Sequence, residues 1–332
     1  MRSDRLIDQY GRLHTKLRVS VTDRCNIRCF YCMPEDNPEY APREEILRFE
    51  EIVRFVRLVL PLGIRKVRLT GGEPLVRRHL DRLVEQLVQL DGLHGLALTT
   101  NGLLLARQAD ALYRAGLRHI NVHLDTLDPQ KFRAITRSDG LADVLRGIER
   151  CKELGFETIK INAVAVRGFT ESDIVPLAQF ARSQDVTVRF IEFMPLDAQN
   201  RWERERVLFA SEILERIQEE IMPLVPLSGA DPTAPAQEFV FEDGVGRIGV
   251  IASVSRPFCS QCNRLRLTAD GKLRYCLFAV EEFDVKRLLR GGASDEEIRQ
   301  FVCQAVYRKW EGHEINTARF IKPPRPMYSI GG

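Results

Sequence analysis

Short apolar runs alternate with longer segments of helical periodicity, and this alternation limits the possible folds more than any other feature. Six runs rich in Val, Ile and Leu have the length of strands, at residues 16–22, 66–70, 95–99, 119–125, 158–166 and 187–193. Helical periods lie between them at residues 49–60, 80–90, 104–115, 141–154 and 172–183. Such repeats form parallel strands with right-handed crossovers. The sequence therefore predicts an α/β fold, a partial (β/α)6 TIM-like barrel.

The alternation stops near residue 225. Four prolines between residues 223 and 235 indicate an irregular connection, and residues 239–241 and 247–253 have the character of a hairpin. We therefore expect a barrel domain at residues 1–225 and a C-terminal α+β extension at residues 226–332 that closes the barrel. Prolines in the last eleven residues predict that this tail lies extended over the surface.

Six of the eight cysteines form two groups of three. The first trio follows the first predicted strand with the spacing C-x3-C-x2-C and consists of Cys25, Cys29 and Cys32. The second trio lies in the extension with the spacing C-x2-C-x13-C and consists of Cys259, Cys262 and Cys276. Cys151 and Cys303 lie in helix-like segments, where we expect ordinary packing.

Three thiolates suggest a metal centre with one open position, because structural zinc and electron-transfer [4Fe–4S] clusters use four protein ligands. No fourth Cys or His is evident beside either trio. Two [4Fe–4S] clusters, each with one iron free to bind a small molecule, fit this pattern. Buried small side chains, or a zinc site that recruits a fourth ligand, remain alternatives.

Composition excludes several partners. The 49 Lys and Arg nearly balance the 46 Asp and Glu, so the net charge of +3 creates no large field that would attract nucleic acid or a membrane surface. No apolar stretch reaches the ~18 residues of a membrane span, and the first residues lack a secretory signal. We expect a cytoplasmic protein whose anion site, if present, is local.

Two motifs, a cysteine loop and a Gly-Gly-Glu turn, occur in the order and spacing that one known superfamily has. The segment from Cys25 to Cys32 has an aromatic residue, Tyr31, just before its last Cys, and resembles the signature of the radical S-adenosylmethionine superfamily. Gly71, Gly72 and Glu73 follow the second predicted strand and resemble the GGEP motif of that superfamily. Glycines let the backbone approach a ligand closely, and Glu73 is suited to orient a cationic amine.

Further motifs narrow the resemblance and run through essentially the whole chain. They are TTNG at residues 99–102, LDT at 124–126, RFIEFMP at 189–195, CSQCNRLR at 259–266, DGKLR at 270–274 and a terminal Gly-Gly. Together they resemble molybdenum cofactor biosynthesis protein A, the GTP 3′,8-cyclase family. The resemblance implies a partial barrel, two [4Fe–4S] clusters, S-adenosylmethionine as cofactor and GTP as substrate.

Residue roles follow from the resemblance by position. It implies that the first trio and the second trio each hold one cluster. For S-adenosylmethionine it implies contacts from Tyr31, Gly71, Gly72, Glu73, His123 and Met194, although most relatives have Ser where this chain has His123. For GTP it implies contacts from Arg18, Arg68, Thr99, Lys160, Arg189, Arg264, Leu265 and Arg266. It assigns a catalytic role to Arg18, Gly331 and Gly332.

The implied reaction is the conversion of GTP to (8S)-3′,8-cyclo-7,8-dihydroguanosine 5′-triphosphate by a 5′-deoxyadenosyl radical, the first step of molybdenum cofactor biosynthesis. It requires an external one-electron reductant, and its product passes to cyclic pyranopterin monophosphate synthase. A homodimer is possible. Two rival hypotheses remain: a two-cluster radical enzyme that modifies a peptide, whose auxiliary cysteines form longer arrays, and a non-catalytic zinc-binding or RNA-binding module. The near-neutral charge argues against RNA.

Overall fold

A single curved sheet organises the molecule, seen in a computed structural model that describes residues 5–229 and 231–331. Its twelve strands have the order β12-β11-β10-β1-β2-β3-β4-β5-β6-β9-β8-β7. The strands are β1 (Lys16–Ser20), β2 (Lys66–Thr70), β3 (Gly95–Thr100), β4 (His119–His123), β5 (Thr158–Ala165), β6 (Thr187–Glu192), β7 (Leu224–Pro226), β8 (Gln237–Phe241), β9 (Arg247–Ile251), β10 (Arg264–Leu267), β11 (Lys272–Arg274) and β12 (Phe283–Asp284).

The six predicted barrel strands are confirmed as β1 to β6, and each pairs with the next in parallel. The sheet also extends at both sides with strands from the C-terminal part of the chain. Strand β10 pairs in parallel with β1, and β9 pairs in parallel with β6. The predicted hairpin is present as β8 and β9, but β9 also continues the barrel. The division of the chain into two domains at residue 225 stays a prediction. Strands from before and after this residue are hydrogen-bonded in one sheet.

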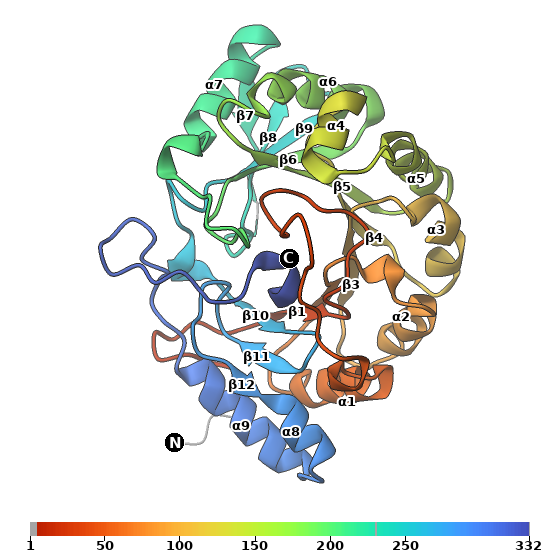
Figure 1. The fold of residues 1–332 in the computed structure, drawn as a ribbon, viewed down its shortest axis with the longest axis vertical. Coiled ribbons are helices and arrows are strands. Elements are labelled where there is room, and N and C mark those ends of the chain that lie inside the picture. The colour runs from red at the N-terminus through yellow and green to blue at the C-terminus, as the bar shows by residue number, and fades with distance from the viewer. Residues whose placement is uncertain (1–4, 230, 332) are drawn as a thin grey trace.

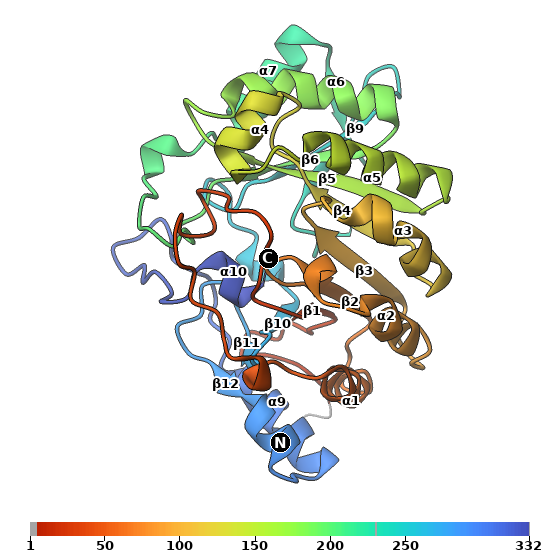
Figure 2. The same ribbon diagram turned by 45° about the vertical axis from the view of Figure 1, so that its right-hand side comes forward.

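Most helices lie on the outside of the curved sheet (Figures 1 and 2). The described helices are α1 (Phe49–Val59), α2 (Leu80–Val88), α3 (Leu105–Arg114), α4 (Pro129–Thr136), α5 (Leu141–Glu153), α6 (Ile174–Gln184), α7 (Ala210–Glu220), α8 (Val285–Arg290), α9 (Asp295–Tyr307) and α10 (Met327–Ile330). Among residues 5–229 and 231–331, no helix combines the length and the apolar character needed to cross a bilayer.

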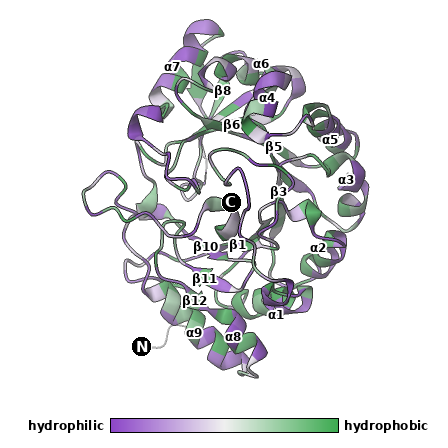
Figure 3. Ribbon diagram, in the orientation of Figure 1, coloured by the Kyte–Doolittle hydropathy of each residue, from purple (hydrophilic) through white to green (hydrophobic). Residues whose placement is uncertain are grey.

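The core lies between the sheet and these helices. Along β1 and β2, Leu17, Val19, Val67 and Leu69 are buried in it, because alternate side chains of a strand point to opposite faces. Figure 3 shows hydrophobic and hydrophilic residues alternating along the outer helices, as expected for helices that pack on one side only. The remaining side chains of the barrel strands therefore point to the interior of the barrel.

The expectation of an extended surface tail is wrong. After Pro326 the chain forms the short helix α10, and Tyr328 and Ile330 are buried. Proline excludes helix only in the residues around it, and the apolar side chains beyond Pro326 gain free energy by leaving water. Helix α10 consequently lies at the centre of the barrel (Figure 1).

Candidate active site

One cavity of about 730 Å³ in the barrel brings most of the predicted site residues together. All six cysteines of the two trios line it. The other predicted residues on its wall are Arg18, Tyr31, Arg68, Gly71, Gly72, Thr99, His123, Lys160, Arg189, Met194, Arg264 and Arg266. The two trios, more than 200 residues apart in the chain, therefore share one space.

The loop of the first trio is tied to the Gly-Gly turn after β2. Gly72 N donates to Thr22 O (2.7 Å), and Glu73 N donates to Arg24 O (2.8 Å). A Cβ atom added at Gly72 would lie 2.5 Å from Arg24 O and 2.6 Å from Asp23 O. Only glycine permits this approach, so the turn and the cysteine loop form a single backbone cradle.

Glu73 connects that cradle to the TTNG motif. Its carboxylate is fully buried and accepts hydrogen bonds from Leu75 N (2.8 Å), Thr100 Oγ1 (2.7 Å) and Asn101 N (2.6 Å). Asn101 Nδ2 donates in turn toward Cys25 Sγ (3.7 Å). Burial raises the pKa of Glu73 to about 7, although these hydrogen bonds act against it. The contacts give Glu73 a structural role, and its contact with a methionine amine stays a prediction.

His123 belongs to a buried polar cluster with Tyr31 and Asp125. The Tyr31 hydroxyl donates to Asp125 Oδ2 (2.5 Å) and contacts His123 Nε2, which lies 3.0 Å from the same carboxylate oxygen. Asp125 Oδ1 accepts from Val164 N (2.7 Å). Burial lowers the pKa of His123, but the Asp125 carboxylate outweighs it and raises the pKa overall. His123 lies on the cavity wall with one ring nitrogen engaged, and its contact with the cofactor stays a prediction.

Cationic side chains form two rows across three neighbouring strands. The strand register places Arg266, Arg18 and Arg68 in one row, and Arg264, Lys16 and Lys66 in the other. Burial, followed by repulsion from neighbouring guanidiniums, lowers the pKa of Arg18 well below its usual range. The same causes lower the pKa of Arg266 to about 9. Because the three arginines of the first row repel one another in a buried space, that row suits a polyanionic ligand. In the second row Lys66 is exposed and Lys16 is paired with Asp231 (2.7 Å).

The second trio is surrounded by donors from both ends of the chain. Cys262 Sγ accepts from Lys309 Nζ (3.4 Å) and from Arg264 Nη2 (3.5 Å). Arg12 Nη1 donates to Cys259 O (2.7 Å). Burial would raise the pKa of Cys262, but Arg264 and Lys309 lower it to about 6. This thiol is therefore readily deprotonated, which metal ligation requires.

Gly331, the last described residue, contacts the cavity wall but does not line the cavity itself. Arg266 Nη1 donates to Gly331 O (2.6 Å). Gly331 has φ +91°, and a Cβ atom there would lie 2.7 Å from Ser20 Cβ. A larger residue would therefore clash and be strained at this position. Gly332, also predicted to be catalytic, lies outside the described residues.

Three predicted site residues do not line the cavity, namely Glu73, Leu265 and Gly331. Leu265 is 1% exposed and packs into the hydrophobic core, because it points away from Arg264 and Arg266 on the same strand. A substrate contact at Leu265 would have to come from its backbone. Cys151 is buried in the hydrophobic core, and Cys303 is partly buried and packs against the same core. Both cysteines have the packing role that we expected.

The donor set fits the implied cofactors. Each trio presents three thiols to the cavity. Within the described ranges, no group of three or more Cys, His, Asp or Glu side chains, the two trios included, has the arrangement of a site for a single metal ion. Thr70 Oγ1 and Asn162 Oδ1 belong to residues on the same wall, and both are buried without a hydrogen-bond partner in the described structure. Unpaired buried polar atoms facing a cavity suit a polar ligand.

Comparison with known proteins identifies the family. Residues 19–181 match the Radical SAM superfamily, and residues 186–315 match Molybdenum Cofactor Synthesis C. The chain is 48% identical over 330 residues to a GTP 3′,8-cyclase of Rhodopirellula baltica, covering 98% of this chain and 92% of that protein. It is 43% identical over 326 residues to a GTP 3′,8-cyclase of Thermodesulfovibrio yellowstonii, covering 98% and 99%. The chain belongs to the GTP 3′,8-cyclase family.

The fold of this GTP 3′,8-cyclase family member is similar to that of Streptococcus suis SuiB bound to S-adenosylmethionine, with a TM-score of 0.61 at 15% identity over 97% of this chain and 78% of that one. The predicted family and the predicted partial barrel are thus confirmed. The family match sets aside the peptide-modifying enzyme and the zinc-binding module as identities of the chain.

Sequence reasoning missed several residues of this site. Lys16 and Lys66 line the cavity. Each lies two residues before a predicted arginine on the same strand, so strand alternation could have found them. Lys309 and Arg12 are remote from the trios in sequence, and no local pattern marks them.

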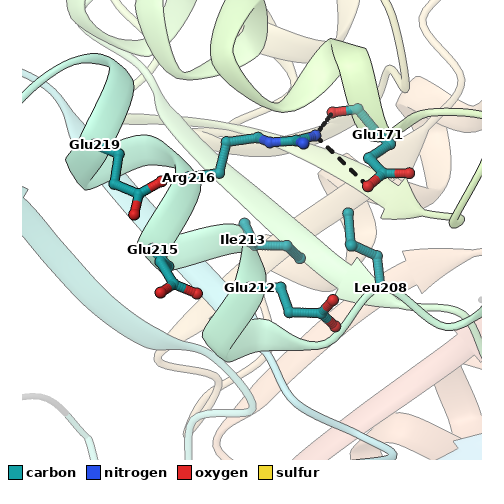
Figure 4. Close-up of a pocket in the computed structure, with 7 residues that line it drawn as sticks. All are labelled: Glu171, Leu208, Glu212, Ile213, Glu215, Arg216 and Glu219. Carbon is teal, nitrogen blue, oxygen red and sulfur yellow. Dashed lines mark hydrogen bonds and ion pairs between the residues drawn. The ribbon is translucent and has the colours of Figure 1, made fainter.

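A second, smaller pocket of about 190 Å³ lies on α7 (Figure 4). Its wall includes Glu212, Glu215 and Glu219, and Arg216 Nη1 donates to Glu171 O (3.0 Å). None of the predicted site residues of this GTP 3′,8-cyclase family member lines it.

Proposed function

We propose that the protein is a GTP 3′,8-cyclase, which converts GTP to (8S)-3′,8-cyclo-7,8-dihydroguanosine 5′-triphosphate in the first step of molybdenum cofactor biosynthesis. The observation that carries the proposal is the shared cavity, whose wall holds both cysteine trios and the two cationic rows. The family membership of the chain supports the same activity.

The enzyme uses S-adenosylmethionine and two [4Fe–4S] clusters, one held by each trio. When bound and reduced, the first cluster and S-adenosylmethionine together supply a carbon radical that abstracts a hydrogen atom. Tyr31, Gly71, Gly72, His123 and Met194 hold S-adenosylmethionine, and Glu73 keeps the Gly-Gly turn against the cysteine loop.

The chain's own residues bind and orient the nucleotide. Arg18, Arg68, Lys160 and Arg189, with Thr99, bind the triphosphate because guanidinium and ammonium groups neutralise phosphate oxygens. Arg264, Arg266 and the second trio hold the guanosine end. With both ends of the substrate fixed, one ribose C–H is presented for abstraction, and the competing positions are held away.

Arg18 and the C-terminal glycines act closest to the reaction. Arg18 is on the wall beside both Arg68 and Arg266, where it stabilises negative charge on the substrate. The tail fills the barrel near Ser20, which excludes water from the reacting atoms.

The cellular setting belongs to the same proposal. An external one-electron reductant delivers electrons, and cyclic pyranopterin monophosphate synthase takes the product. The protein works in the cytoplasm without nucleic acid or membrane partners.

Anaerobic incubation of the reconstituted protein with S-adenosylmethionine, dithionite and each nucleoside triphosphate tests the function. We expect 5′-deoxyadenosine and a cyclised nucleotide with GTP only. Equal 5′-deoxyadenosine formation with ATP, CTP and UTP would contradict the assignment of the substrate.

A further inference from the structure

A carboxylate lies among the cations assigned to the triphosphate. Glu238 is on β8, and its Oε1 atom accepts hydrogen bonds from Lys160 Nζ (2.9 Å), Arg189 Nη2 (2.6 Å) and Arg189 Nε (3.2 Å). The three side chains are mostly buried, with exposed fractions of 20%, 20% and 13% for Glu238, Lys160 and Arg189. Burial would raise the pKa of Glu238, but these two cations outweigh it and lower the pKa. The group is therefore an anion.

The sheet is shaped for this contact. In the register of the strands, Gly249 of β9 lies between Arg189 of β6 and Glu238 of β8. A Cβ atom at Gly249 would lie 2.9 Å from Arg189 Cγ. Because Gly249 has no side chain, the Arg189 side chain can cross β9 and reach the carboxylate on the far strand.

The other carboxylates on the cavity wall are engaged elsewhere. Glu192 accepts from the backbone of Val254 (2.7 Å) and Ala210 (2.9 Å). Asp231 accepts from Lys16 Nζ (2.7 Å). Among the wall residues, Glu238 is thus the acid that is paired with the proposed triphosphate ligands Lys160 and Arg189.

We propose that Glu238 is a positioning residue for two ligands of the triphosphate: it pairs with Lys160 and Arg189 when no substrate is bound and gives them up to the terminal phosphates of the substrate. The inference rests on the proposed function, because it takes these two cations as ligands of the triphosphate.

Competition for the same donors has a definite consequence. A ligand that reaches Lys160 and Arg189 must break the pairs with Glu238 and tolerate its charge nearby. A ligand with a short phosphate chain does not reach them and is unaffected. Glu238 therefore weakens binding of a triphosphate selectively, while it keeps two buried cations paired when no substrate is bound.

The Glu238→Gln variant tests this. Equilibrium dialysis under anaerobic conditions measures binding of GTP, GMP and inorganic triphosphate to the wild-type protein and the variant, each reconstituted with iron and sulfide. Glu242→Gln is the matched control, since Glu242 is exposed, lies outside the cavity wall and carries the same charge. Circular dichroism checks that both variants are folded.

We expect Glu238→Gln to bind GTP and inorganic triphosphate about tenfold more tightly than the wild type at low salt, as expected from the loss of two competing ion pairs. GMP binding should change less than twofold, and salt should reduce the gain. Unchanged or weaker triphosphate binding in Glu238→Gln, or an equal gain in Glu242→Gln, would overturn the inference. If the wild type binds inorganic triphosphate but not GTP, the proposed function fails. The role of Glu238 is then decided by whether Glu238→Gln binds inorganic triphosphate more tightly than the wild type does.

Discussion

Replacement of Lys309 by Met tests the support of the second trio. Lys309 is almost fully buried, with an exposed fraction of 2%. Its ammonium group donates to Cys262 O (3.0 Å), Arg264 O (3.1 Å) and Cys262 Sγ (3.4 Å). Methionine has a similar length and no donor. The substitution leaves two backbone carbonyls without this partner and removes one of the two cations that favour the Cys262 thiolate.

The cost can be worked out from these contacts. A buried acceptor left without its partner costs ~1–3 kcal/mol, so two carbonyls cost ~2–6 kcal/mol. The variant no longer has to bury an ammonium group, which offsets part of this cost. We expect the free energy of unfolding to fall by about 3 kcal/mol. For a chain of this size that corresponds to a fall of about 4 °C in the unfolding midpoint of the metal-free protein.

The assay is iron and sulfide content after anaerobic reconstitution, together with thermal unfolding. We expect the Lys309→Met variant to hold about four iron atoms per chain where the wild type holds about eight, because only the second trio is affected. Arg308→Met is the control, since the neighbouring Arg308 side chain is 63% exposed and pairs with Glu281 at the surface (2.7 Å). Full iron content and an unfolding midpoint equal to that of the control would refute the argument.

Two other substitutions and one deletion give separate tests. Gly72→Ala forces a Cβ atom against two backbone carbonyls, and we expect S-adenosylmethionine binding to weaken at least tenfold in a dialysis assay. Deletion of Gly331 and Gly332 should leave both clusters and S-adenosylmethionine binding intact and stop cyclisation; wild-type turnover would contradict this. Burial, with help from Lys309 and Arg12, lowers the pKa of His14 to about 2, so its contribution to stability is present above pH 6.5 and is lost as the pH falls. Between pH 7 and 5 the His14→Gln variant should lose about 2 kcal/mol less stability than the wild type in urea unfolding.

Local patterns were enough to predict the barrel strands but not the edges of the sheet. Strands β1 to β6 each carry a run of apolar residues that signals a strand without any knowledge of its neighbours. The pairing of β10 with β1 joins residues about 250 positions apart, and nothing in either segment specifies that partner. The helix at Met327–Ile330 was missed for a related reason, since its stability comes from burial in the barrel and not from local propensity.

The candidate active site likewise contains residues that local patterns predict and residues that they do not. The two trios follow from their spacing, and the inward arginines follow from the family resemblance, whose motifs each span a few residues. Lys309, Arg12 and Glu238 act through contacts that exist only after the sheet has formed. Their residue types carry no distinguishing signal, because most Lys, Arg and Glu side chains lie at the surface.

The pairing of β10 with β1 also bears on how the protein is made. Strands β1 and β10 are synthesised about 250 residues apart, so on the ribosome one edge of β1 has no partner until β10 has emerged. At about 5–20 residues per second the nascent chain waits many seconds with that edge exposed to other chains. The second trio is likewise synthesised more than 200 residues after the first, so the interior of the barrel stays open to iron delivery in that interval.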